Sequence, residues 1–165
     1  MTSSGAHIGP IPGRVTADAH GDLVVFLIGM RFNRFTAINA WLPVLRAMPR
    51  MLRKLSADDD SGLLGHRSLL DPPRGIYLVQ YWQSMEKLLA YAANPSQEHH
   101  PAWAAFQRRV RTSGGRVGIW HETYQVRAGC YESVYVDMPL HGLGEVAGVV
   151  PITSRGNRAA QRLGR

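Results

Sequence analysis

The alternation of apolar and polar positions begins with a strong strand signal early in the chain. In "DLVVFLIGMRF", residues 22–32, both alternating sets of side chains are apolar. A strand with this pattern is expected to be buried on both faces. Residues 36–55 follow with helical spacing, which predicts an amphipathic helix. Its apolar positions are Ile38, Trp41, Leu45, Met48, Leu52 and Leu55.

The remaining segments predict two more helical segments and four more strands. Residues 62–70 and 75–82 are typical of two strands joined by the turn "DPPR". Ser84 is the expected N-cap of a helix that would place Met85, Leu88, Leu89 and Ala92 on one face. A further helix is expected over residues 101–111. The segments 116–126 and 130–136 predict a fourth and a fifth strand.

The order β-α-β-β-α-β, with one extra strand, is that of an α+β ferredoxin-like sandwich, the split βαβ arrangement. Two helices cover only one face of its sheet. Because the first strand is apolar on both faces, we expect a second copy to cover the other face, as a homodimer that forms a dimeric α+β barrel. The expected domain organisation is an irregular lead-in over residues 1–20, a single domain over 21–150 and a basic flexible tail over 151–165.

Composition narrows the class of protein. The 165 residues are 45% apolar and 19% charged, as in an ordinary soluble globular protein. The single cysteine, Cys130, excludes an intramolecular disulfide and a cysteine-rich zinc site, and fits a cytoplasmic location. Neither a membrane-spanning apolar run nor a secretory signal is visible. We therefore expect a cytoplasmic protein without a membrane partner.

The net charge of +7 would suit an anionic partner such as nucleic acid. However, four arginines lie in the last eleven or so residues, "RGNRAAQRLGR", and no nucleic-acid-binding motif accompanies them. We attribute the charge to solubility and to the tail, and expect no specific nucleic-acid partner.

The stretch "NPSQEHHPAW" carries the first candidate chemistry, His99 and His100. Proline disfavours helical backbone in the residue before it, so His100 should cap a helix that starts at Pro101. The positive end of the helix dipole would then lower the pKa of both imidazoles. Neutral imidazole binds iron or accepts a proton. The alternative is a surface cap without any ligand.

His121 is the second candidate. Alternation along residues 116–126 places it on one face with Ile119 and Thr123, and places Glu122 and Tyr124 on the other. Titratable groups crowd the last two predicted strands, which suggests a site because buried groups of this kind need partners. They include Glu122, Tyr124, Tyr131, Glu132 and Tyr135. The alternative is a hydrogen-bonded dimer seam.

Three tryptophans, Trp41, Trp82 and Trp103, either line an aromatic substrate pocket or belong to the core. His66, between apolar residues of a predicted strand, is a weaker candidate. The chain has no HExxH spacing, no GxGxxG and no P-loop. We therefore expect no metal site, and no flavin or nicotinamide held by its usual motif.

The segment "GIYLVQYWQSMEKLLAYAANPSQEHHPAWAAF" resembles the antibiotic biosynthesis monooxygenase superfamily. "GIWHETYQV" with "YESVYVDMPLHGLG" resembles a smaller family within it, the fumagillin-pathway monooxygenase-like proteins, over about residues 20–150. The resemblance implies an enzyme of secondary metabolism that oxidises a small hydrophobic metabolite, aromatic or polyketide-like, without a cofactor. His121, or His99 or His100, would be its base.

The resemblance also implies two alternatives. Some members of the superfamily bind haem through a histidine on the helix after the third strand, where His99 or His100 would be the axial ligand and Trp82 matches the aromatic that ends the strand. Such a protein would be an aldoxime-dehydratase-like lyase or a peroxide-using enzyme. The other alternative is a non-catalytic dimeric protein that binds a small molecule.

Overall fold

The computed structural model of the chain describes residues 9–93 and 114–164. The chain divides into a terminal unit, Met1–Leu23 with Val126–Arg165, and a central unit, Val24–Gln125. The sequence predicts one domain over residues 21–150, so the division at Leu23 and Val126 is a feature that the hydrophobic pattern did not indicate. Each unit is described by itself.

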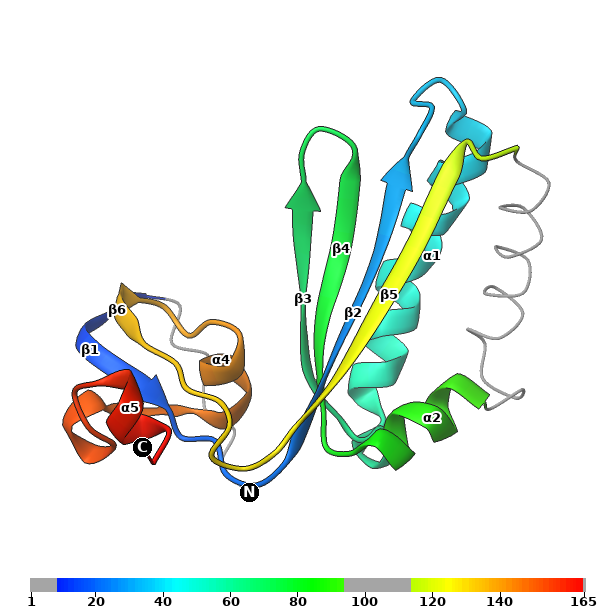
Figure 1. Cartoon of the computed structure of the whole chain (residues 1–165). Coiled ribbons are helices and arrows are strands. Elements are labelled where there is room, and N and C mark those ends of the chain that lie inside the picture. The colour runs from blue at the N-terminus through cyan, green and yellow to red at the C-terminus, as the bar shows by residue number, and fades with distance from the viewer. Residues whose placement is uncertain (1–8, 94–113, 165) are drawn as a thin grey trace. The chain divides into compact units, whose positions relative to one another are not determined.

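The central unit contains a four-stranded sheet with the order β3-β4-β2-β5 (Figure 1). Its strands lie within two residues of the predicted ones: β2 (Leu23–Phe32), β3 (Leu63–Asp71), β4 (Gly75–Trp82) and β5 (Val117–Val126). Strand β4 pairs antiparallel with both β2 and β3. Val24 and Met30 of β2 are buried, whereas residues 25–28 are half-buried, so the apolar pattern of this strand exceeds what the chain itself covers.

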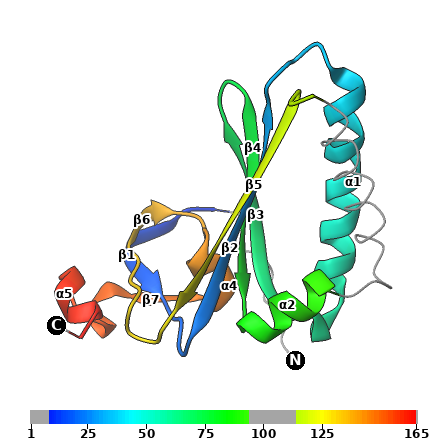
Figure 2. The same ribbon diagram turned by 45° about the vertical axis from the view of Figure 1, so that its right-hand side comes forward.

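Two helices cover one face of this sheet (Figure 2). They are α1 (Ile38–Ala57), followed by the short turn η1 (Asp59–Ser61), and α2 (Met85–Ala93). The order β2-α1-β3-β4-α2-β5 is that of a ferredoxin-like α+β fold, as the sequence predicts. The predicted helix over residues 101–111 lies outside the described residues.

A cluster of buried side chains joins both helices to the sheet. It consists of Val24, Leu55, Trp82 and Leu88, one from each of β2, α1, β4 and α2. Trp82 has no exposed surface, and its indole N–H donates to Oε1 of Gln80 at 3.0 Å. A fully buried aromatic side chain contributes about 3–5 kcal/mol relative to alanine, so this cluster is a major source of stability in the central unit.

Helix α2 begins at the predicted N-cap, but the set of side chains that it buries differs from the prediction. The Ser84 hydroxyl accepts a hydrogen bond from the Lys87 N–H at 3.2 Å, which confirms the predicted N-cap. Leu89, however, is exposed rather than part of the inward face. Tyr91 packs on Trp82 instead, with ring centroids 5.4 Å apart, and burial raises its pKa to about 12.

Helix α1 contains two prolines, Pro43 and Pro49. The helix begins at Ile38, so Pro43 lies in its second turn. The missing amide hydrogen bonds are offset by packing, since Leu52 and Leu55 of this helix are buried against the sheet.

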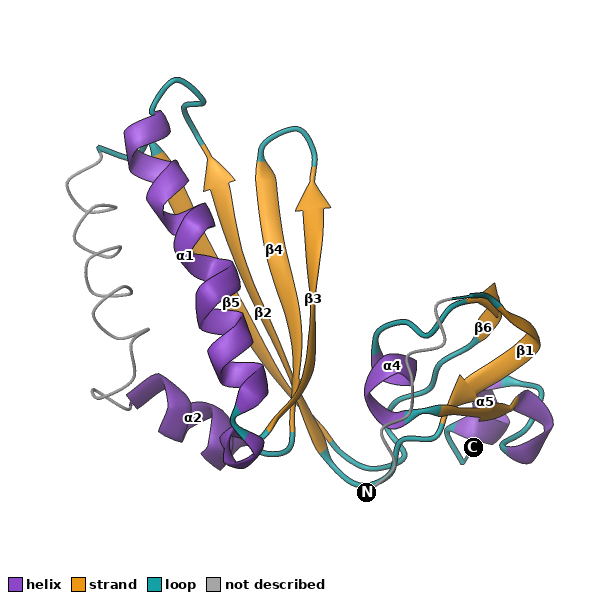
Figure 3. Ribbon diagram, turned by 180° about the vertical axis from the view of Figure 1, so that it is seen from behind, coloured by secondary structure: helices purple, strands orange, loops and turns teal. Residues whose placement is uncertain are grey.

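The terminal unit has a second, three-stranded sheet with the order β6-β1-β7 (Figure 2). Figure 3 shows β1 and β6 from behind. Its strands are β1 (Ile11–Ala17), β6 (Tyr135–Met138) and β7 (Val149–Pro151), and both pairings with β1 are antiparallel. The helical segments are α4 (Leu143–Ala147), η2 (Ile152–Ser154) and α5 (Ala159–Arg162).

Three sequence-based expectations are corrected here. Strand β1 occupies the segment expected to be irregular; its signal is obscured by Gly13, which has a φ of 84° and lies where the register with β6 shifts. The fifth strand starts at Tyr135 rather than at residue 130, and it pairs with β1 instead of extending the large sheet. The expected tail contains η2 and α5.

Two arginines of that segment, Arg155 and Arg162, have carboxylate partners within the terminal unit. Arg162 lies 2.7 Å from Glu132 with only 5% of its side chain exposed, and Arg155 lies 2.7 Å from Asp18. The hydrogen bond from Arg155 lowers the pKa of Asp18. These arginines contribute to local structure, whereas their spacing in the sequence predicts only a solvated tail.

On the face of the sheet opposite the helices, Gly29 lies in close contact with a side chain of β5. A Cβ at Gly29 would collide with the indole ring of Trp120 on β5. We predict that Gly29→Ala lowers the free energy of unfolding by about 1–3 kcal/mol, the usual cost of overpacking. Urea denaturation would measure this change.

The matched control is Gly118→Ala on β5, where the nearest atom to the new Cβ is Nδ2 of Asn33 at 3.5 Å. This variant should stay within about 1 kcal/mol of the parent. The pair Gly29→Ala and Trp120→Ala should be non-additive, because the second change removes the obstacle. Equal effects of the two glycine variants would contradict the assigned contact.

Candidate functional site

One row of side chains crosses the helix-facing side of the central sheet. His66 of β3 pairs with Gln80 of β4, which pairs in turn with Phe26 of β2. The Phe26 ring lies beside His121 of β5, with ring centroids 5.9 Å apart. Phe26 packs against the cluster that contains Leu55 of α1, so this row faces the helices. All four strands therefore contribute one residue to the same side of the sheet.

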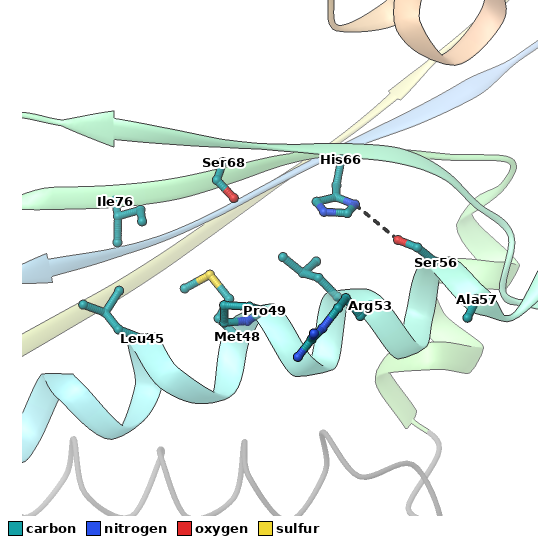
Figure 4. Close-up of a pocket in the computed structure, with 10 residues that line it drawn as sticks. Leu45, Met48, Pro49, Arg53, Ser56, Ala57, His66, Ser68 and Ile76 are labelled. Atoms are coloured by element: carbon teal, nitrogen blue, oxygen red, sulfur yellow. Dashed lines mark hydrogen bonds between the residues drawn. The ribbon is translucent and has the colours of Figure 1, made fainter. Parts of the chain in front are cut away.

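A cavity of about 520 Å³ lies between α1 and the β3–β4 hairpin (Figure 4). Much of its wall is apolar: Leu45, Met48, Pro49, Leu52, Ala57 and Ile76. The polar groups on the wall are Arg53 and Ser56 of α1 with His66 and Ser68 of β3. A mostly apolar cavity of this size with a few polar groups is suited to a small organic molecule.

His66 is the imidazole on this wall. Its Nδ1 lies 3.4 Å from the hydroxyl of Ser56, and the dashed line in Figure 4 marks this contact. Ser68 lies two residues further along β3, on the same face of the strand. Arg53 turns its guanidinium away from the His66 ring in Figure 4, so its stem lines the cavity while its charge lies apart.

Sequence reasoning gave little weight to His66 and missed Ser56. A histidine between apolar residues of a strand has no local signal of function. The alternation His66–Arg67–Ser68 does indicate a shared face for His66 and Ser68. The contact with Ser56, however, depends on how α1 packs on β3, which a hydrophobic pattern does not specify.

The structure separates the candidates on β5. His121 is exposed on the helix-facing side, whereas Glu122 and Tyr124 lie on the opposite face because side chains alternate along a strand. The Tyr124 hydroxyl donates to Oε2 of Glu122 at 2.6 Å, and this hydrogen bond raises the pKa of Tyr124. His121 therefore does not share a site with Glu122 or Tyr124.

The two described tryptophans among the pocket candidates are packing residues. Trp82 is fully buried in the core. The indole N–H of Trp41 donates to the carbonyl of Phe35 at 3.0 Å, and its ring packs against Phe32 with centroids 5.1 Å apart. Neither residue is among those that line the cavity. Each acts on the cavity only indirectly: Trp41 helps to hold α1 in place, and Trp82 helps to hold β4 in place.

The tyrosine candidates Tyr131 and Tyr135 belong to the terminal unit. The Tyr131 hydroxyl donates to the carbonyl of Gly21 at 2.9 Å, and burial raises its pKa. The Tyr135 hydroxyl accepts a hydrogen bond from the Gly144 N–H at 3.0 Å. Both hydroxyls are thus engaged with backbone groups of their own unit.

The remaining candidates, His99, His100 and Trp103, lie outside the described residues. Within residues 9–93 and 114–164, no group of three or more His, Cys, Asp or Glu side chains is arranged to hold a metal ion. In the same part of the chain, no helix is both long and apolar enough to cross a membrane.

Comparison with known proteins identifies relatives. The family model Monooxygenase af470-like matches residues 23–143. Monooxygenase af470 of Aspergillus fumigatus is 29% identical over 137 residues, which cover 76% of this chain and 47% of the relative. The chain therefore spans about half the length of this curated relative.

Solved structures resemble the chain at lower identity. The cofactor-independent oxygenase SnoaB of Streptomyces nogalater is 14% identical with a TM-score of 0.41, over 64% of this chain and 94% of that one. An aldoxime dehydratase is 17% identical with a TM-score of 0.50, over 86% of this chain and 44% of that one. Because the family model covers most of the chain, including the whole central unit, this protein belongs to the monooxygenase af470-like family.

Proposed function

We propose that the chain is a monooxygenase-type enzyme of secondary metabolism that oxidises a small hydrophobic metabolite, aromatic or polyketide-like. The observation that supports this most is the apolar cavity with His66 on its wall, within a member of a monooxygenase family. The cavity would hold the metabolite between α1 and the β3–β4 hairpin. A ligand of this class needs apolar walls for affinity and one or two polar groups for orientation.

His66 would be the general base. If its Nδ1–H donates to Ser56, the lone pair of Nε2 is left to accept a proton from the substrate. The carbanion that results transfers an electron to O₂. For a methylene that becomes a carbonyl, one oxygen atom enters the product and the other leaves as water, so the substrate itself supplies the electrons. Apolar side chains such as Leu45, Met48 and Leu52 would exclude water from the reactive intermediate.

His121 stays a second candidate for the base. It lies on the same helix-facing row as His66, two strands further across the sheet, but it is exposed and does not line the cavity. A base must come within hydrogen-bond reach of the proton that it removes. The position of the bound metabolite therefore decides between the two histidines.

This reaction requires no cofactor. A haem-dependent reaction in the same fold would use His99 or His100 as axial ligand, and that alternative stays a prediction because both residues lie outside the described part of the chain. A non-catalytic binding protein would use the same cavity and differ only in the absence of turnover.

We also propose that the protein is a homodimer, with a second copy covering the face of the central sheet that α1 and α2 leave open. That face carries Val25, Leu27 and Val79, with Trp120 and Tyr124 among the exposed large side chains. An antiparallel sheet with one face in water normally carries polar side chains there. Apolar and aromatic residues at these positions favour a protein surface as the cover.

Loss of the base should show in oxygen consumption. With a panel of quinols and aromatic polyketides, we expect His66→Gln to lower kcat by about 10²–10⁴, the usual contribution of a general base, with little change in KM. An oxygen electrode would measure turnover. His121→Gln is the matched control and should retain the parent rate.

The opposite pattern, with turnover lost in His121→Gln and kept in His66→Gln, would identify His121 of β5 as the base. Saturable binding of a panel member to the parent protein without oxygen consumption would indicate a binding protein rather than an oxygenase.

The dimer can be tested with an exposed tyrosine on the open face. We expect Tyr124→Lys to weaken self-association by tenfold or more, because a charge would be buried at the interface. Sedimentation equilibrium would measure the dissociation constant. Leu70→Lys is the matched control, since Leu70 is exposed near the β3–β4 turn, on the other side of the sheet. A parent protein that stays monomeric at all concentrations would contradict the proposal.

A further inference from the structure

Gln80 is a buried polar residue at the middle of the helix-facing row. Only 6% of its surface is exposed, and its neighbours across the sheet are His66 on β3 and Phe26 on β2. Buried amides are costly unless both their oxygen and their nitrogen have partners. The partners of this amide therefore indicate what the residue does.

The Trp82 indole fixes which way the amide points. Its N–H lies 3.0 Å from Oε1 of Gln80. Indole nitrogen is a donor only, so the oxygen of the amide must face Trp82 and the NH₂ group must point elsewhere. Trp82 is itself immobilised, because it is fully buried and packs against Tyr91. The orientation of the amide is thus determined by chemistry and held by the core.

The NH₂ group of Gln80 has no acceptor among the described residues, although it offers two N–H donors. An unpaired buried donor costs about 1–3 kcal/mol, so groups of this kind are rare and call for an explanation. A bound molecule that supplies an oxygen would remove this cost.

We propose that the Gln80 amide donates a hydrogen bond to an oxygen of the molecule that binds beside His66, so that the site selects carbonyl compounds with an acidic C–H bond or phenols. This inference rests on the proposed function of the cavity. Opposed Cβ atoms in an antiparallel pair lie about 4.5–5.5 Å apart. His66 lines the cavity, and Gln80, its neighbour across the strand pair, lies just outside the lining, so a ligand oxygen reaches the amide where it enters beside the His66 ring on the side of β4.

The arrangement suits proton removal next to a carbonyl group. When Nε2 of His66 takes the proton, the electron pair of the C–H bond moves toward the carbonyl, and negative charge develops on its oxygen. A donor already fixed at that oxygen stabilises the enolate without having to reorient. Gln80 would thus be both a specificity determinant and a stabiliser of the charged intermediate, while His66 carries the proton.

The test compares 1-indanone with indane, which differ by one carbonyl group. Calorimetric titration should show that the parent protein binds 1-indanone about fivefold more tightly, as expected for one neutral hydrogen bond. Gln80→Met should bring the two affinities to the same value by weakening 1-indanone alone. Gln83→Met, the same change at an exposed neighbouring position, should keep the fivefold preference.

A second variant distinguishes loss of the amide donor from loss of the fold. Gln80→Glu keeps an oxygen for the Trp82 indole but, once ionised, has no N–H or O–H to donate, so the preference for 1-indanone should vanish as the pH rises above the pKa of the new carboxyl. Persistence of the fivefold preference in folded Gln80→Met or in ionised Gln80→Glu would overturn the assignment of Gln80.

A different result is expected if the cavity is not the ligand site. If the parent protein binds neither indane nor 1-indanone, the cavity is not the ligand site, and both the proposed function and the role of Gln80 are wrong. If both bind with equal affinity, the cavity stands as an apolar site and only the role of Gln80 is overturned.

Discussion

The central unit depends on the burial of β2 between β4 and β5. Both faces of this strand are apolar, so it is stable only where neighbouring strands and helices remove it from water. It pairs with β4 in a register that runs from Trp82 opposite Val24 to Gly75 opposite Arg31, which keeps the apolar side chains of both strands on matching faces. That register places Trp82 under α1 and α2, and it places Gln80 and His66 in one row. The candidate site is therefore a consequence of how one hydrophobic strand is buried.

The sequence predicts an element well where the element has a local pattern, and poorly where the element depends on contacts with distant residues. Helix α1 is strongly periodic, and the strands of the central sheet are apolar-rich runs bounded by turn residues, so their predicted bounds agree with the structure within about two residues. Strand β1 was missed because Gly13 and a register shift interrupt its alternation, and its partners lie far along the chain. Leu89 was assigned to the wrong face because one helical turn fits either Leu89 or Tyr91, and only the packing on Trp82 decides.

The candidate site in the structure differs from the one that the sequence predicts, for a physical reason. Candidate residues were chosen by type and by local spacing, and side chains such as Trp82 and Tyr135 satisfied those criteria while serving the core and the backbone. The pairing of His66 with Ser56 needs a helix packed on a particular edge strand, and the orientation of Gln80 needs the Trp82 indole. Contacts of this kind are long-range or depend on which hydrogen-bonding atom faces which, so periodicity contains no information about them.

The two segments of the terminal unit affect the order in which the chain folds during its synthesis on the ribosome. The central unit is one continuous segment, so all its elements emerge in sequence and its local contacts form early. Strand β1 emerges before the central unit, but its pairing is completed only after that unit has been synthesised, because the N–H of Gly13 bonds to Asp137, 124 residues later. Until then β1 is an unpaired edge with apolar residues exposed, which is the kind of segment that chaperones protect. Strand β1 is thus synthesised before the central unit and completes its pairing after it.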